Sequence, residues 1–365
     1  MREVRYHRKG GRPMSAKDPV PAQLTGLVTL ALFTLGTETL PRRLSALGGA
    51  AWLCPLLAGA AVWGAVLLLT RRPLAGRRLL SGERRPLGAR ALALLLLLWG
   101  LAAGGGQTLR VSARLAGDLR GSPLLLAAAV LALSAWMAAG GLAALGRAGR
   151  LFGWAVGLTF ALTVLFALPG LRWDWVLLWD GKDLSGLPRG TAAVLGGLAP
   201  GAYALLLVED LKPGEKGEGR ALRGPLALFP LLALGDLLAA GRLGPGLAAA
   251  VESPFFQMVS GLGFQGAFQR LEELVSALWL LGDLILLAVL LLALRRLAAR
   301  AFRVREGPGT VWALAGCLLA LTAAWIAWGS GIQAEALWPG ELAAGLILAG
   351  LTAVTKNFKK IKKGG

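Results

Sequence analysis

The side chains of this chain that could take part in chemistry are carboxylates within apolar stretches. Asp283 lies near the middle of such a stretch and shares a helical face with Glu272, Ser276 and Trp279. Ionisable groups at membrane depth are costly and usually functional, and Asp236 is a second, weaker example. Two hypotheses stay open for Asp283: it binds a ligand amine, a cation or a proton, or it is a buried, protonated carboxyl that bonds a neighbouring helix.

Glu38 is a third carboxylate in an apolar stretch, and Thr37 and Thr39 flank it. It pairs either with a ligand ammonium or metal cation, or with Arg42 or Arg43 about one turn further along; the second interpretation is slightly favoured.

Three polar residues, Gln107, Arg110 and Arg114, follow one another at helical spacing in another apolar stretch. They lie near its end, so we expect them to form an ion network at the membrane interface, with Asp118 as a partner of one arginine. Contact with an approaching ligand is the alternative.

Sequence motifs of catalytic sites are missing from the chain. It contains no Walker A loop, no HExxH motif and no nucleophile elbow. Cys54 and Cys317 lie in apolar stretches without CxxC spacing, so neither a disulfide nor a metal site is expected. We therefore predict a protein that is not an enzyme and has no catalytic residues, metal or cofactor.

The elements that must position these residues are membrane-spanning helices. About twenty apolar residues suffice for a helix to cross a bilayer, and such stretches recur along the chain. The predicted spans are 22–44, 46–70, 91–110, 122–143, 151–169, 190–208, 222–241, 271–294, 310–330 and 338–355. The sequence thus predicts an all-α membrane protein with ten transmembrane helices in one domain, 21–355, between two basic tails, 1–20 and 356–365.

The distribution of positive charge predicts the orientation. Of the 39 Lys and Arg residues, 29 fall in the two tails and in alternate loops. Because cytoplasmic loops carry the excess of positive charge, both termini are expected in the cytoplasm. The net charge of +19 is then explained by anionic lipid rather than by nucleic acid.

Glycine and proline interrupt the first and sixth spans. The first contains Gly36-Thr37-Glu38-Thr39-Leu40-Pro41, and the sixth contains Gly196-Gly197-Leu198-Ala199-Pro200-Gly201. Ten helices divide into two sets of five in inverted orientation, each opening with such a segment. This pattern is typical of transporters that bind ligand at two broken helices, although Gly and Pro are also simply common in membrane helices.

A ligand site at the two predicted breaks would be completed by polar residues of neighbouring spans. The predicted ligand-binding residues are Thr34, Gly36, Thr37, Glu38, Gly197, Pro200, Gly201, Tyr203, Ser276 and Asp283.

Short motifs in a fixed order resemble a known family. They are Gly36-Thr37, Leu40-Pro41, Ala51-Trp52-Leu53, Ser122-Pro123, and Arg270-Leu271-Glu272 followed by Trp279. Together they resemble the B subunits of spore nutrient-germinant receptors, the spore permease group of the amino acid/polyamine/cation transporter superfamily.

This resemblance implies a LeuT-like fold in the spore inner membrane, with A-type and C-type receptor subunits as partners. It implies a subunit that senses a small nutrient, often an amino acid, and triggers ion release; the alternative is an autonomous proton- or cation-coupled amino acid permease. One feature departs from the superfamily. Glu38 stands where amino acid transporters have the second glycine of Gly-x-Gly, and its charge would repel a ligand carboxylate.

Overall fold

The computed structural model describes residues 21–70, 86–177, 179, 181–210, 224–262 and 271–328. Within these ranges the secondary structure is helical. The α-helices are α1 (Pro21–Ser45), α2 (Leu53–Thr70), α3 (Pro86–Leu119), α4 (Pro123–Ala139), α5 (Gly141–Ala167), α6 (Asp174–Leu177), α7 (Gly181–Gly197), α9 (Leu228–Leu243), α10 (Pro245–Ala250), α11 (Pro254–Ser260), α12 (Leu271–Phe302) and α13 (Pro308–Ala327). Short 3-10 helices are η1 (Gly49–Trp52), η3 (Leu168–Gly170), η4 (Ala199–Asp210) and η5 (Gly224–Ala227).

The described helices match nine of the ten predicted spans. Six helices are long and apolar enough to cross a membrane, and the bent pair of α7 and η4 forms a seventh span. The segments of α2 and α4 are shorter apolar helices. The predicted tenth span, 338–355, and both predicted tails, 1–20 and 356–365, lie outside the described residues. The chain is therefore a multi-pass membrane protein, as its composition predicts.

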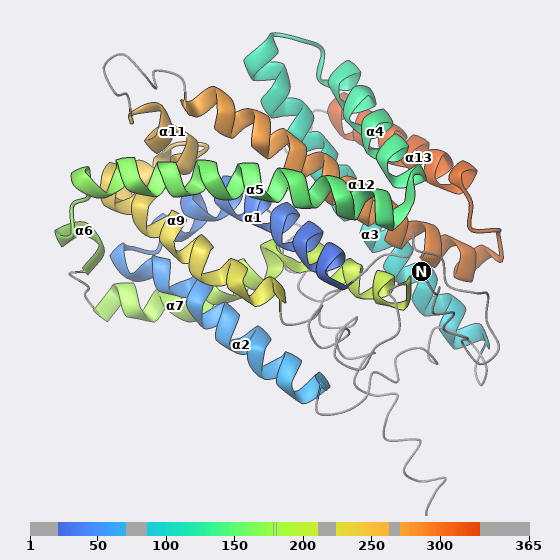
Figure 1. Cartoon of the computed structure of the whole chain (residues 1–365), viewed down its shortest axis with the longest axis horizontal. Helices are drawn as coiled ribbons and strands as arrows, with labels where there is room; N and C mark the ends of the chain where they lie inside the picture. Colours follow the sequence, from blue (N-terminus) through green and yellow to red (C-terminus); the bar gives the residue numbers. More distant parts are fainter. Residues whose placement is uncertain are drawn as a thin grey trace, which may run out of the picture.

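The helices form two groups that meet at α1 and α12. In one group α1, α2, α7 and α9 pack on one another, and in the other α3, α4, α12 and α13 do so. Figure 1 shows the first group at the lower left and the second on the right, with the green α5 lying along both. Because α12 packs on α1 as well as on α3, it connects the two groups.

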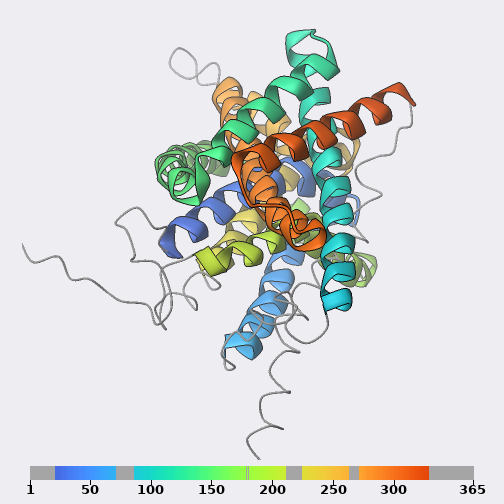
Figure 2. The same cartoon turned by 90° about the vertical axis from the view of Figure 1, so that its right-hand side faces the viewer.

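The degree of burial separates central helices from peripheral ones. In its most apolar stretch 83% of the residues of α12 are buried, against 28% for α5 and α13. Figure 2 looks nearly along α5, which lies at the edge of the molecule. Polar side chains on α12 are consequently held inside protein, whereas the outer faces of α5 and α13 are apolar surface that lipid can cover.

The predicted break in the sixth span is confirmed. Helix α7 ends at Gly197, η4 begins at Ala199, and the two axes differ by 41°. Pro200 lacks a backbone N–H and so cannot continue the α-helical ladder. The backbone instead makes a tight turn in which the N–H of Gly201 donates to the carbonyl of Leu198, 3.0 Å away.

The predicted break in the first span is wrong, because α1 continues without interruption from Pro21 to Ser45. The hydroxyls of Thr34, Thr37 and Thr39 donate to carbonyls three or four residues earlier and so stay within the helical pattern. Gly36 serves close packing instead, since a Cβ there would lie 2.5 Å from Leu232 of α9. Pro41 falls near the end of the helix, where few backbone bonds remain to be lost.

The contact between α1 and α12 depends on a glycine, and this predicts the effect of adding a methyl group. A Cβ on Gly282 would lie 1.9 Å from Oγ1 and 2.6 Å from Cβ of Thr34, so rotating the threonine does not relieve the clash. We expect Gly282→Ala to destabilise the protein by about 1–3 kcal/mol, measured as a lower melting temperature in detergent. Gly316→Ala on α13, where a Cβ meets nothing within 4 Å, is the matched control. Equal melting temperatures for the two variants would contradict the close contact.

Candidate functional site

Asp283 lies at the centre of a buried polar cluster between α3 and α12. Its side chain is 1% exposed, and both oxygens accept a hydrogen bond. Gln107 Nε2 donates to Oδ1 at 2.8 Å, and Arg114 Nη2 donates to Oδ2 at 2.7 Å. A charge-assisted bond to a guanidinium is among the strong hydrogen bonds in proteins, so Asp283 ties α12 firmly to α3.

Arg114 also reaches the carboxylate of Glu38 on α1. The distance from Arg114 Nη1 to Glu38 Oε1 is 2.5 Å, and the two side chains are 15% and 8% exposed. One guanidinium therefore bridges carboxylates from two other helices. We call Glu38, Gln107, Arg114 and Asp283 the Arg114 cluster.

The ion pair of Glu38 corrects the expectation from sequence. Arg42 and Arg43 are its neighbours along α1, but the partner that the structure gives Glu38 is Arg114. Arg42 is exposed to solvent, whereas Glu38 is buried and gains more from a buried cation. Arg114 is likewise part of the interior rather than of an interfacial network with Asp118.

A second layer of contacts joins α1 to α12 beside the cluster. Trp279 Nε1 donates to Oγ1 of Thr37 at 3.1 Å. The guanidinium carbon of Arg114 lies 5.7 Å from the ring centroid of Trp279, within the range of a cation–π interaction. Trp279 thus contacts both α1, through Thr37, and the guanidinium of Arg114.

Aromatic rings enclose a small cavity next to Trp279. The Phe33 and Phe160 rings meet edge to face at 4.9 Å, and Phe255 lies 6.2 Å from Phe160 and 6.1 Å from Trp279. The cavity has a volume of about 20 Å³, and its polar lining comes from Thr34, Thr37, Thr159 and Thr163. We call it the aromatic cavity. Its present volume suits about one water molecule.

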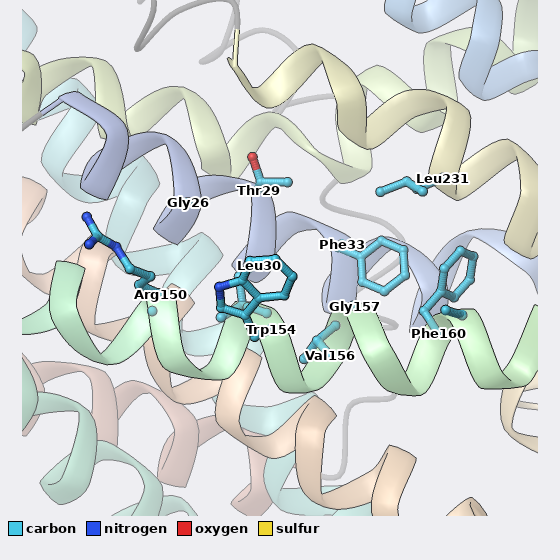
Figure 3. Close-up of a pocket in the computed structure, with 13 residues that line it drawn as sticks. Gly26, Thr29, Leu30, Phe33, Arg150, Trp154, Val156, Gly157, Phe160 and Leu231 are labelled. Carbon is cyan, nitrogen blue, oxygen red and sulfur yellow. The ribbon is translucent and has the colours of Figure 1, made fainter.

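A larger groove lies on the other side of the same rings. It has a volume of about 520 Å³ and runs between α1, α5 and α9. Phe33, Val156 and Phe160 line both spaces, and Figure 3 shows the two rings facing each other, with Trp154 and Arg150 further along α5. Phe33 and Phe160 therefore separate the groove from the aromatic cavity.

The structure brings together four of the predicted ligand-binding residues. Thr34, Thr37, Glu38 and Asp283 belong to the cluster or to the aromatic cavity. Others take part in helix packing: Gly36 contacts Leu232, Gly201 contacts Leu32, and Gly197 lies near Leu40.

Tyr203 lies apart from the cavity and bonds α3. Its hydroxyl donates to the carbonyl of Leu96 at 2.9 Å. Ser276 and Pro200 are half-buried. A ligand-binding role for these residues stays a prediction.

The aromatic half of the site and the interior position of Arg114 were not predicted from the sequence. Phe160 and Phe255 lie on α5 and α11, and no periodic signal distinguishes them from other apolar residues of those segments. Gln107 and Arg114 are seven residues apart, two helical turns, so their shared face was visible in the sequence. What the sequence lacked was the identity of the helix opposite that face.

No protein-family model and no curated protein matches the sequence. The structure is nevertheless similar to solved transporters. A mutant manganese transporter from Eremococcus coleocola aligns with a TM-score of 0.57 at 13% identity, over 92% of this chain and 74% of that one. MhsT in complex with L-phenylalanine aligns with a TM-score of 0.52 at 15% identity, over 90% of this chain and 98% of that one. The chain therefore has the LeuT-like fold that the resemblance implied.

The Arg114 cluster predicts an order of stability among charge-neutralising variants. Arg114→Gln leaves two buried carboxyls without their cation and should cost about 3–5 kcal/mol, whereas Asp283→Asn leaves Glu38 and Arg114 paired and should cost less. Thermal unfolding in detergent gives the comparison, with the exposed Arg305→Gln as the control. If Asp283→Asn were the more damaging variant, the central role of the guanidinium would be refuted.

Proposed function

We propose that this protein binds a small organic molecule at the aromatic cavity and responds by moving α1 and α5 relative to α3 and α12, as a secondary transporter does. The observation that carries this proposal is the Arg114 cluster, which joins α1, α3 and α12 directly beside the cavity. A ligand shifts a conformational equilibrium only if it binds one state better than the other. A molecule that contacts Thr37 and Trp279 would do so, because these residues connect the two helix groups.

The lining of the aromatic cavity favours a ligand with an apolar or aromatic part. Four aromatic rings and three aliphatic side chains surround it, and the threonine hydroxyls supply the polar contacts. A cavity of about 20 Å³ must enlarge to admit more than a water molecule. Rotation of Phe33 and Phe160 would connect it to the groove and supply that volume.

An amino acid is compatible with the charges of this site. Glu38 by itself would repel a ligand carboxylate, but the guanidinium of Arg114 lies against it and weakens that repulsion. MhsT, one of the structural neighbours, is solved with L-phenylalanine bound. We therefore propose an amino acid or a similar small nutrient as the ligand class.

We further propose that the protein is the nutrient-sensing subunit of a spore germinant receptor, in the spore inner membrane with A-type and C-type partners, and that ligand binding is coupled to ion release. Support comes from where the motif residues lie. Thr37 and Trp279 belong to two of the motifs and are hydrogen-bonded to each other. Trp52, from a third motif, donates to the carbonyl of Val176. The motifs thus coincide with contacts between distant helices.

The rival function is an autonomous proton- or cation-coupled amino acid permease, and its specific support is the fold that the chain shares with solved transporters. Reconstitution of the purified chain in liposomes separates the two functions. Accumulation of radiolabelled amino acid driven by a proton or sodium gradient, without any partner protein, would establish the permease. Binding without accumulation would support the sensor.

Ligand binding itself is tested by thermal stabilisation with a panel of amino acids. A ligand at one hundred times its dissociation constant should raise the free energy of unfolding by about 2.7 kcal/mol. Trp279→Phe removes the bond to Thr37 while keeping an aromatic ring, and Asp283→Asn breaks the link to Arg114. Both variants should lose most of the ligand-induced shift.

Thr322→Val on α13 is the control, because its buried hydroxyl bonds only within its own helix. It should keep the full ligand-induced shift. A full shift in Trp279→Phe and Asp283→Asn as well would place the ligand elsewhere in the protein.

A further inference from the structure

The charges of the Arg114 cluster do not balance. Glu38 and Asp283 are two carboxylates, and among the described residues Arg114 is the single cation that contacts them. Fully ionised, the three side chains would carry one net negative charge in a buried site, and burying an uncompensated charge costs far more than burying a neutral polar group.

The geometry indicates which oxygen carries the compensating proton. Both oxygens of Asp283 already accept from nitrogen donors, so a hydrogen on either oxygen would compete with a donor. Glu38 contacts Arg114 through Oε1 only, while Oε2 is buried and has no hydrogen-bond partner among the described residues. A neutral carboxyl with its hydrogen on Oε2 removes the excess charge without breaking any contact that the structure shows.

Other charged side chains surround the cluster more loosely. Arg110 on α3 acts electrostatically on Asp283, but it is only partly buried and solvent screens it. Arg42, one turn beyond Glu38, is exposed, and Glu272 on α12 is only half-buried. Helices α10 and α11, which also pack on α1, contain no ionisable side chain.

Four further elements that pack on α1 carry ionisable groups, namely α5, α7, α9 and η4. On α7, Asp183 lies beside Gly48, beyond the end of α1. On α9, Asp236 is buried and acts on Cys54 of α2. On α5, Arg147 and Arg150 lie at its beginning, and Arg150 lines the groove near Gly26 rather than the cluster. Asp236 is thus a second buried carboxyl that any measurement must separate from Glu38.

A metal ion is a weaker candidate for the compensating charge. Hard cations require six or more oxygen ligands, and the described residues contain no group of three acidic, His or Cys side chains that could hold a metal. The guanidinium of Arg114 already occupies the space between the two carboxylates.

We propose that the Arg114 cluster binds one proton, on Oε2 of Glu38, and that this proton is released to water when α1 separates from α3. The O–H bond of Glu38 breaks, and the carboxylate is left for solvent or Arg114 to stabilise. The link from proton release to helix movement rests on the proposed function, whereas the presence of the proton does not.

Infrared spectroscopy of the full-length protein without ligand tests the proton directly, because a protonated carboxyl has a C=O stretching band that a carboxylate lacks. The measurement uses the Asp236→Asn background at neutral pH in sodium-free buffer. We expect the band of one protonated carboxyl, which shifts after ¹³C labelling of glutamate and not of aspartate. Adding Glu38→Gln or Asp283→Asn should abolish it, since either change leaves one carboxylate for Arg114.

Adding Arg114→Gln should instead give two protonated carboxyls. Arg114→Lys keeps the positive charge and should give one protonated carboxyl, so the proposal can still be tested if Arg114→Gln fails to fold. A band that follows aspartate labelling, or no band at all, would overturn the assignment. A band that sodium abolishes reversibly would identify a cation site and also overturn it. A failed ligand or transport assay leaves these spectra unaffected, so the two proposals fail separately.

Discussion

A mostly buried guanidinium must keep its carboxylate partners, and most of the site follows from this requirement. Arg114 comes from α3, while its partners come from α1 and α12. Breaking a buried ion pair leaves an uncompensated charge, so these helices can separate only if the charges are neutralised or reach water. In a fold built from two helix groups, the Arg114 cluster therefore holds α1, α3 and α12 together.

Glycines allow close packing of the helices around the Arg114 cluster. Gly36 lets α9 approach α1, and Gly282 lets α12 approach Thr34. Membrane helices gain little from burying apolar surface against one another, so backbone approach at glycines and hydrogen bonds between helices supply much of their association. The Thr37–Trp279 bond is one such contact, and it also forms the wall of the aromatic cavity. The same side chains thus join the helices and line the aromatic cavity.

The two helices that were expected to be broken behave differently for a local reason. In the sixth span, Pro200 follows three residues after Gly197, and the chain changes direction there. In the first span, the glycine and the proline are further apart, and the threonine hydroxyls between them donate to backbone carbonyls that precede the glycine. Gly and Pro are tolerated in membrane helices when other groups satisfy the backbone. Their presence alone consequently does not decide whether a helix breaks.

The approximate limits of the described spans follow from the amino-acid sequence alone, because the length and apolarity of a crossing helix are fixed by the bilayer. The sequence also singled out Asp283 and Glu38, since a carboxylate in an apolar stretch stands out without knowledge of its neighbours. The position of Arg114 between these two carboxylates, and the contribution of Phe160 and Phe255 to the cavity, became visible in the folded chain. These residues are far apart along the chain. Glu38, Arg114 and Asp283 belong to three different helices, and a helical period records which side chains share a face, not which helix lies opposite.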